Sequence, residues 1–212
     1  SFQKTDKRKY IINFLPHYQI VGFYYILKNE HLFLFCFTGD DWMATQHYTH
    51  TEDYVKNFYE KIGITTPQEL NFQTIAEQLG IYVFYWSDAS QALFTGNKGF
   101  ILLNESLTSQ QQWQEFCHEL AHVLFHAGNQ SKIPPSFREY QEAKANIFMS
   151  HAAIPTFMLD RLSIYDFDFM TVYEVQKLFN VEYEFALERL QHYLTQHKLY
   201  AKLEYPNRFS KE

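Results

Sequence analysis

The chain has 212 residues, a net charge of −6 and a pI near 5.9. This length suits one domain, or one domain with a small appendage, and the negative charge argues against a general polyanion-binding surface. With only two cysteines, Cys36 and Cys117, we expect no disulfide framework and a reducing, cytoplasmic location.

Residues 1–42 are unusually rich in aromatic and aliphatic side chains. The stretch YQIVGFYYILKNEHLFLFCFTG predicts a β-hairpin around a Lys-Asn-Glu turn. Polar residues interrupt each apolar run before it reaches the roughly 20 residues of a membrane span, and no signal-peptide cleavage site is visible. An alternative hypothesis makes residues 1–42 an upstream extension and Met43 the physiological start. A native N-terminus before residue 43, found by mass spectrometry, would contradict it.

Two helices are predicted next. TEDYVKNFYEKIGI has Thr51 as its N-cap and Gly63 as its stop, and TTPQELNFQTIAEQLGI begins near Pro67 and ends at Gly80. Strands rich in β-branched and aromatic residues follow at 81–86 and 99–104, with a short piece around ALFT expected to pair between them. These three segments predict a small antiparallel sheet.

The second half of the chain is predicted to be helical. SLTSQQQWQEFCHELAHVLFHAG reads as one long helix, capped by Thr108 or Ser109 and stopped at Gly128. SFREYQEAKANIFMSHAAI predicts another, with Ser136 and Glu139 as a capping box, which Pro155 ends. Two amphipathic helices are expected at about 169–179 and 182–196. The fold class is therefore α+β and mostly helical.

The stretch HELAHVLFH holds the strongest functional signal. Residues four apart lie on one face of a helix, so His118 and His122 can bind one metal ion. Glu119 lies beside them, where it can act as a general base on a water at the metal. The alternative is a surface helix with incidental histidines. The apolar neighbours argue against it, because a buried histidine pair without a metal is hard to satisfy.

A catalytic zinc site needs a third protein ligand, and EAKAN supplies a candidate. Glu142 can ligate the metal, and Asn146, one turn later, can hydrogen-bond a ligating histidine. Glu139 competes with Glu142 for this role but is better used in the capping box. A solvated surface charge is the other interpretation of Glu142.

Further candidates in this region carry weaker signals. His126 continues the four-residue series but is one turn too far along to join an ideal tetrahedral site, so we expect it to pack or to line a cleft. Tyr140 is a candidate donor to the oxyanion. His151 and His192 are expected to be packing residues.

Over about residues 50–195, the chain resembles the ImmA/IrrE family of metallopeptidases. The resemblance rests on the order and spacing of IAEQLGIYVFYW, GFILLN, WQEFCHELAHVLFHAG, EAKANIFMSHAAIP and VYEVQKLFNVEYEFALERLQHY. It implies a zincin-like peptidase with a gluzincin-like Zn²⁺ site, in which His118, His122 and Glu142 are ligands and Glu119 is the catalytic base. It also implies cleavage of a helix-turn-helix transcriptional repressor, which derepresses mobile-element (prophage or integrative element) or stress-response genes.

The expected organisation is an N-terminal extension at 1–42, a zinc metallopeptidase domain at 43–155 and a C-terminal helical subdomain at 156–212. This subdomain looks like a helix-turn-helix, which favours the alternative of a DNA-binding regulator. Its second helix, however, carries Glu182, Glu184 and Glu188 against only Arg189. That charge is wrong for phosphate contacts.

We therefore expect the C-terminal subdomain to help hold the repressor, with no direct nucleic-acid binding and no membrane partner. A non-proteolytic, antitoxin-like binding module that keeps the fold remains the other alternative. The intact HExxH motif argues against it.

Overall fold

The computed structural model describes the backbone of residues 20–28, 31–38, 48–95, 98–125, 134–162, 164 and 166–204, and side chains in these ranges between 48 and 196. The chain divides into two compact units, Ser1–His47 and Tyr48–Glu212. Residues on both sides of the expected 155/156 boundary lie in the second unit. Met43, the hypothetical start, lies outside the described residues.

The first unit contains the predicted β-hairpin. Strands β1 (Ile20–Lys28) and β2 (His31–Thr38) pair antiparallel, with Lys28 opposite His31. The register shifts between Ile20 and Gly22, which marks an irregularity at the open end of the hairpin. The antiparallel pairing matches the predicted hairpin, and residues 29–30 of the predicted turn lie outside the described residues.

Helix α1 (His50–Lys61) opens the second unit and begins before the predicted cap. Thr49 and Glu52 form the capping box: the Thr49 hydroxyl accepts from the Glu52 amide, and the Glu52 carboxylate accepts from the Thr49 amide at 2.7 Å. Thr51 therefore lies inside the helix, because a Thr followed three residues later by Glu satisfies two free amides.

The second predicted helix is interrupted. A 3₁₀ turn, η2 (Pro67–Glu69), is followed by α2 (Phe72–Leu79), which Asn71 caps by accepting from the Thr74 amide. Helix α2 ends at Gly80, whose φ of 67° lies in the left-handed region that glycine favours. Proline thus starts a short turn here, and asparagine starts the helix.

The sheet contains the three predicted strands, but its pairing differs from the prediction. Strands β3 (Tyr82–Trp86), β4 (Gln91–Thr95) and β5 (Lys98–Asn104) lie in the order β3-β5-β4. β5 is central and runs parallel to β3 and antiparallel to β4, so the sheet is mixed and not antiparallel. β4 pairs with β5 on one side, and because β3 pairs with β5 on the other, β4 lies at the edge of the sheet.

Helices α3 (Ser109–Phe125) and α4 (Pro135–Ala153) pack against each other, and α3 also packs on the sheet. Thr108 and Gln111 cap α3 reciprocally, as predicted for Thr108. The Ser136 cap is wrong: α4 starts at Pro135, because proline suits the first turn, where an amide has no partner in any case. Gly128 lies outside the described residues.

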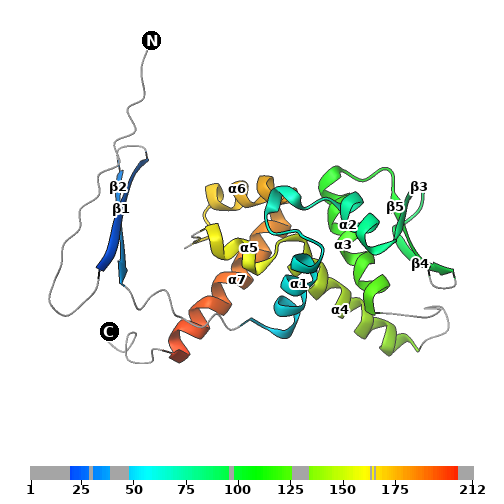
Figure 1. The fold of residues 1–212 in the computed structure, drawn as a ribbon. Helices are drawn as coiled ribbons and strands as arrows, with labels where there is room; N and C mark the ends of the chain where they lie inside the picture. Colours follow the sequence, from blue (N-terminus) through cyan, green and yellow to red (C-terminus); the bar gives the residue numbers. More distant parts are fainter. Residues whose placement is uncertain are drawn as a thin grey trace, which may run out of the picture. The chain divides into compact units, whose positions relative to one another are not determined.

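The remaining elements are α5 (Thr156–Leu159), η4 (Asp160–Leu162), α6 (Phe169–Phe179) and α7 (Tyr183–Glu204). α6 has the predicted bounds. Figure 1 shows the second unit with the sheet beside α2 and α3 at one end and α5, α6 and α7 at the other. One continuous core joins them. Within the described residues, no helix combines the length and apolarity that crossing a bilayer requires.

Candidate metal centre

The HExxH segment occupies the second half of α3, between the sheet and α4. Phe116, Leu120 and Ala121 are fully buried in the core, which fixes the rotation of the helix about its axis. The face of α3 that carries His118 and His122 then points toward α4. The amphipathic pattern of α3 therefore orients the two histidines before any metal is considered.

Gly99 on β5 allows α3 to approach the sheet closely. A Cβ atom built at this position would lie 2.9 Å from Cγ1 of Val123. Real Cβ atoms do not tolerate such a contact, so any larger residue would push α3 away from the sheet. This glycine helps set the position of the helix that carries His118 and His122.

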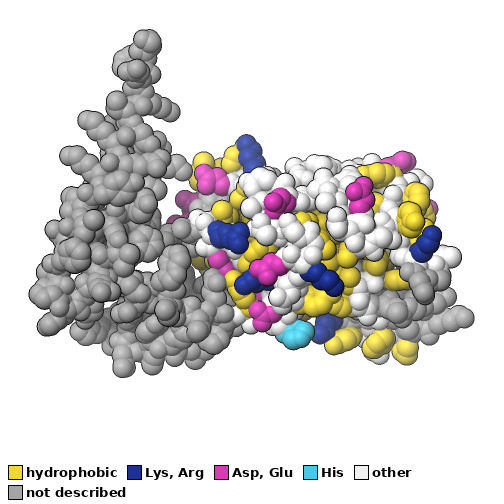
Figure 2. Space-filling model, in the orientation of Figure 1, with side chains coloured by type: hydrophobic (Ala, Val, Ile, Leu, Met, Phe, Trp, Pro, Cys, Tyr) yellow, Lys and Arg dark blue, Asp and Glu magenta, His cyan; other side chains and the backbone are white. Residues whose placement is uncertain are grey.

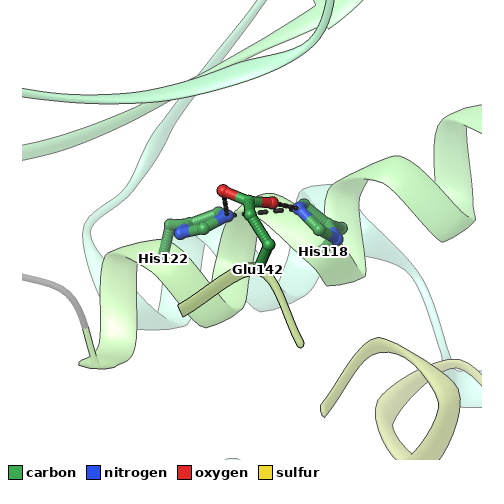
Figure 3. Close-up of side chains that lie close together, drawn as sticks. All are labelled: His118, His122 and Glu142. Carbon is green, nitrogen blue, oxygen red and sulfur yellow. Dashed lines mark hydrogen bonds and ion pairs between the residues drawn. The ribbon is translucent and has the colours of Figure 1, made fainter. Parts of the chain in front are cut away.

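Three side chains from α3 and α4 converge on one point. His118 and His122 contribute Nε2 atoms 3.1 Å apart. The Glu142 carboxylate reaches across from α4, 3.2 Å from Nε2 of His118 and 3.6 Å from Nε2 of His122. Figure 3 shows the carboxylate lying between the two rings. Candidate ligand atoms of all three residues lie within 4.8 Å of one another.

Asn146 indicates which ring nitrogen of His118 carries a hydrogen and which one faces the cluster. The Asn146 side-chain oxygen lies 3.0 Å from Nδ1 of His118, and an amide oxygen can only accept a hydrogen bond. With Nδ1 as the donor to Asn146, Nε2 is the ring nitrogen that faces Glu142 and can ligate a metal ion. A cation or an additional proton has to satisfy such a group.

The spacing of the donors also fits a tetrahedral ion. Two ligand atoms that each lie 2.0–2.1 Å from Zn²⁺ at a tetrahedral angle are about 3.3 Å apart. The two Nε2 atoms are 3.1 Å apart; Oε2 of Glu142 lies 3.2 Å from Nε2 of His118, and Oε1 of Glu142 lies 3.6 Å from Nε2 of His122. His118, His122 and Glu142 thus form a group that can hold a metal ion.

Glu119 is buried beside this cluster, at 7% exposure. Burial raises the pKa of its carboxyl to about 7, a hydrogen bond from the backbone of Ala92 opposes the shift, and the negative charges of Glu115 and Glu142 add to it. The carboxyl is thus held between α3 and the edge strand β4, and it can exchange a proton near neutral pH.

The structure brings Asn146 and Glu142 to His118, as expected for those two residues. Tyr140 is 56% exposed and lines a pocket with Tyr54, Phe125 and Phe148; none of the three cluster residues lines this pocket. His126 lies outside the described residues. The backbone of Ala92 was not foreseen, because strand periodicity does not tell which carboxyl a strand will meet.

Comparisons with known proteins find two relatives that cover most of this chain. The sequence is 39% identical over 142 residues to the phage-like element PBSX protein XkdA of Bacillus subtilis strain 168, covering 67% of this chain and 72% of that protein. It is 35% identical over 152 residues to YqaB of the same strain, covering 70% of this chain and 88% of that protein.

A solved structure of a Mycobacterium tuberculosis transcriptional regulator matches with a TM-score of 0.49 at 18% identity, covering 68% of this chain. This chain spans 56% of that regulator. The family model for the IrrE N-terminal-like domain, Peptidase_M78, matches residues 76–191, which include α3, α4 and the three-residue cluster. The chain therefore belongs to the IrrE N-terminal-like (Peptidase_M78) family, as its resemblance predicted.

Proposed function

We propose that this protein is a zinc-dependent endopeptidase that cleaves a helix-turn-helix transcriptional repressor. One observation carries the proposal: candidate ligand atoms of His118, His122 and Glu142 lie within 4.8 Å of one another, next to the buried carboxyl of Glu119. Membership of a peptidase family supports the same chemistry.

His118, His122 and Glu142 would hold the zinc ion, and Asn146 would keep the His118 ring in the tautomer that binds it. When bound, zinc polarises the scissile carbonyl and lowers the pKa of water.

Glu119 acts as the proton carrier. Its ionised carboxylate takes a proton from the water whose oxygen attacks the carbonyl carbon. It then gives this proton to the amide nitrogen as the C–N bond breaks. A pKa near 7 suits both steps, because the group accepts and releases a proton with little cost at neutral pH. The Ala92 amide keeps the carboxylate oriented during both steps.

Strand β4 is suited to hold the substrate backbone. It is the outer strand on one side of the sheet, and its residue Ala92 contacts the catalytic carboxyl. An extended peptide can add to the free edge of such a strand through main-chain hydrogen bonds. We therefore expect the scissile segment to be unfolded or extended when it is cut.

The proposed substrate class is based on the relatives of this protein. XkdA is named as a protein of a phage-like element, and the family resemblance implies repressors that silence mobile-element or stress-response genes. Cleavage of such a repressor would release those genes. The non-proteolytic binding module is the competing function, and the same experiment distinguishes the two.

The test uses the full chain with zinc and the repressor encoded beside its gene. Wild-type protein should carry about one zinc ion, measured by elemental analysis, and should cut the repressor at one bond, found by mass spectrometry.

Glu119→Gln should keep the zinc and lose 10²–10⁴-fold in cleavage rate, about what a general base contributes. Glu188→Gln, the same change on the exposed face of α7, is the matched control. Undiminished cleavage by Glu119→Gln would refute the proposed role, and zinc binding without any cleavage would favour the binding module.

A further inference from the structure

Helix α6 and the residues before it expose large apolar side chains. Phe169 is 65% exposed, Met170 52%, Phe167 44% and Tyr173 37%. We call these four residues the α6 patch. The opposite face of the same helix buries Val172, Val175 and Phe179 in the core, so core packing does not account for the patch.

Ring contacts hold two of the four side chains of the patch, Phe169 and Tyr173. The rings of Phe169 and Tyr173, one turn apart, stack with centroids 6.1 Å apart and planes within 10°. Phe169 also contacts Tyr183 of α7 at 5.7 Å, and the Lys177 ammonium lies 4.4 Å from the Tyr173 ring centroid. These contacts order the side chains before any partner arrives, which reduces the entropy cost of binding.

Two carboxylates border the patch at fixed positions. Asp168 caps α6 by accepting from the Thr171 amide at 2.7 Å. Asp166 accepts from the Thr171 hydroxyl at 3.3 Å. Both aspartates are exposed. Figure 2 shows hydrophobic and acidic side chains next to one another at the end of the second unit where α6 lies.

The exposed area is large for a monomer surface. A fully exposed large side chain offers roughly 200 Å², so the patch exposes on the order of 400 Å² of apolar surface, within the range of functional patches. A standard protein interface buries about 800 Å² on each partner, of which slightly more than half is apolar. The patch would supply nearly all of that apolar part.

The border of the patch carries two carboxylates, Asp166 and Asp168, and one ammonium, Lys177, so its charge is negative overall and favours a basic partner. Carboxylates repel nucleic acid and anionic lipid. In a two-fold dimer through this patch, Asp166 and Asp168 would approach their own copies, which disfavours a second chain. A helix with apolar residues on one face and Lys or Arg beside them would satisfy both the rings and the acids.

We propose that the α6 patch is the docking surface for a basic amphipathic helix of the protein substrate, separate from the place where the bond is cut. This inference rests on the proposed function and deepens it, because DNA-binding repressors carry basic helices. Docking on α6 would raise the local concentration of the scissile segment at the metal centre.

The first test measures binding to two synthetic 20-residue helical peptides by fluorescence anisotropy, with the full chain in its Glu119→Gln form. Both peptides have Leu at helical spacing; one carries Lys at the remaining positions and the other Glu. The Lys peptide should bind more tightly and lose affinity with added salt. Equal binding of both peptides would overturn the proposal.

The second test changes the patch. Asp166→Asn with Asp168→Asn removes two charges and keeps the helix cap, because Asn caps as well as Asp; we expect about 3- to 10-fold weaker binding of the Lys peptide. Phe167→Ser with Met170→Ser should weaken it about tenfold or more. Phe84→Ser, on the 51% exposed Phe84 of β3, is the matched control and should bind normally. Unchanged affinity in both patch variants, or a patch variant that only dissociates a dimer of this chain, would refute the docking role.

Cleavage kinetics separate this proposal from the proposed function. With active protein, patch variants should raise KM for the whole repressor and leave kcat, and the cutting of a short peptide spanning the bond, unchanged. If the patch variants cleave the repressor with an unchanged KM, the docking surface is refuted but the peptidase activity is not. If the wild-type protein binds the Lys peptide tightly but cleaves nothing, the proposed peptidase function is refuted but the docking surface is not.

Discussion

Helix α4 contributes to two clusters of histidine and glutamate with opposite character. At one end, Glu142 meets His118 and His122, and candidate ligand atoms of all three lie within 4.8 Å of one another. At the other end, His151 lies 3.8 Å from the Glu52 carboxylate in the core between α1 and α7. The two clusters contain the same residue types, but only the second has a buried arginine beside it.

The second cluster already contains its cation. The buried Arg189 donates to the Thr156 hydroxyl at 2.6 Å, which in turn donates to Glu52 at 2.6 Å. Arg189 also lies 3.1 Å from Nδ1 of His151, so this nitrogen accepts and the ring is neutral. The short distance from His151 to Glu52 is therefore a contact and not an ion pair.

The pKa values follow from the same difference. Burial, the positive charge of Arg189 and, more weakly, His192 lower the pKa of His151 to about 3, and Glu52 only partly opposes them. Burial opposes the ionisation of Glu52, but hydrogen bonds from Thr156 and Thr49 outweigh it and lower the pKa of its carboxyl. A histidine beside a carboxylate thus indicates a metal site only where no other donor satisfies the pair.

The largest expected effect is on the second cluster. Arg189→Met should lower the free energy of unfolding by about 3–5 kcal/mol, because it leaves Glu52 buried without its cation, and it should leave zinc binding intact. Urea unfolding of the metal-free protein measures this. Adding Glu52→Gln should restore part of the loss, and Arg161→Met, at an exposed arginine, should cost about 1 kcal/mol or less. A loss of about 1 kcal/mol or less in Arg189→Met would contradict the idea that Arg189 balances the buried charge of Glu52.

The next effect is on the first cluster. Zinc at a hundredfold excess over Kd should stabilise the wild-type protein by about 2.7 kcal/mol. His122→Ala should remove this stabilisation, because only two ligands remain. The measurement is the zinc-dependent shift of the unfolding midpoint, with His192→Ala, a histidine outside the cluster, as control. Equal zinc stabilisation of His122→Ala and the wild type would contradict the site.

A smaller effect is expected from the residue that orients a ligand. Asn146→Ala should weaken zinc binding about 10- to 100-fold, because His118 loses the acceptor that fixes its tautomer. Asn146→Asp keeps an acceptor and should bind zinc at least as well as the wild type. Competition with a chelator gives both affinities. Unchanged affinity in Asn146→Ala would show that packing alone orients the ring.

The last prediction concerns the pH dependence of stability, which is measured as a slope. The pKa of His151 is about 3 in the folded protein and about 6.5 in an unfolded chain, so unfolding takes up a proton between these values. The stability that His151 contributes is present above pH 6.5 and is lost as the pH falls toward 3, by at most about 1.4 kcal/mol per pH unit. His151→Gln in the metal-free protein should reduce this slope. His50→Gln, at an exposed histidine, should not, and identical slopes in all three proteins would contradict the neutral, buried state of His151.

Much of the secondary structure was predictable because it depends on neighbours in sequence. The bounds of α6 and the pairing of β1 with β2 follow from periodicity and turn residues. The errors arose where two local signals competed. Ser136 looked like a cap, but Pro135 starts α4, and Pro67 looked like a helix start, but Asn71 caps α2.

By itself, the sequence determined that His118 and His122 share one face of a helix and that Glu142 and Asn146 share another, since the α-helical period places residues four apart together. Tertiary packing decided that these two faces meet. It also decided that β5 lies between β3 and β4, that the Ala92 backbone reaches Glu119, and that Arg189 rather than a metal satisfies His151. These outcomes depend on contacts between residues tens of positions apart, which no local pattern encodes.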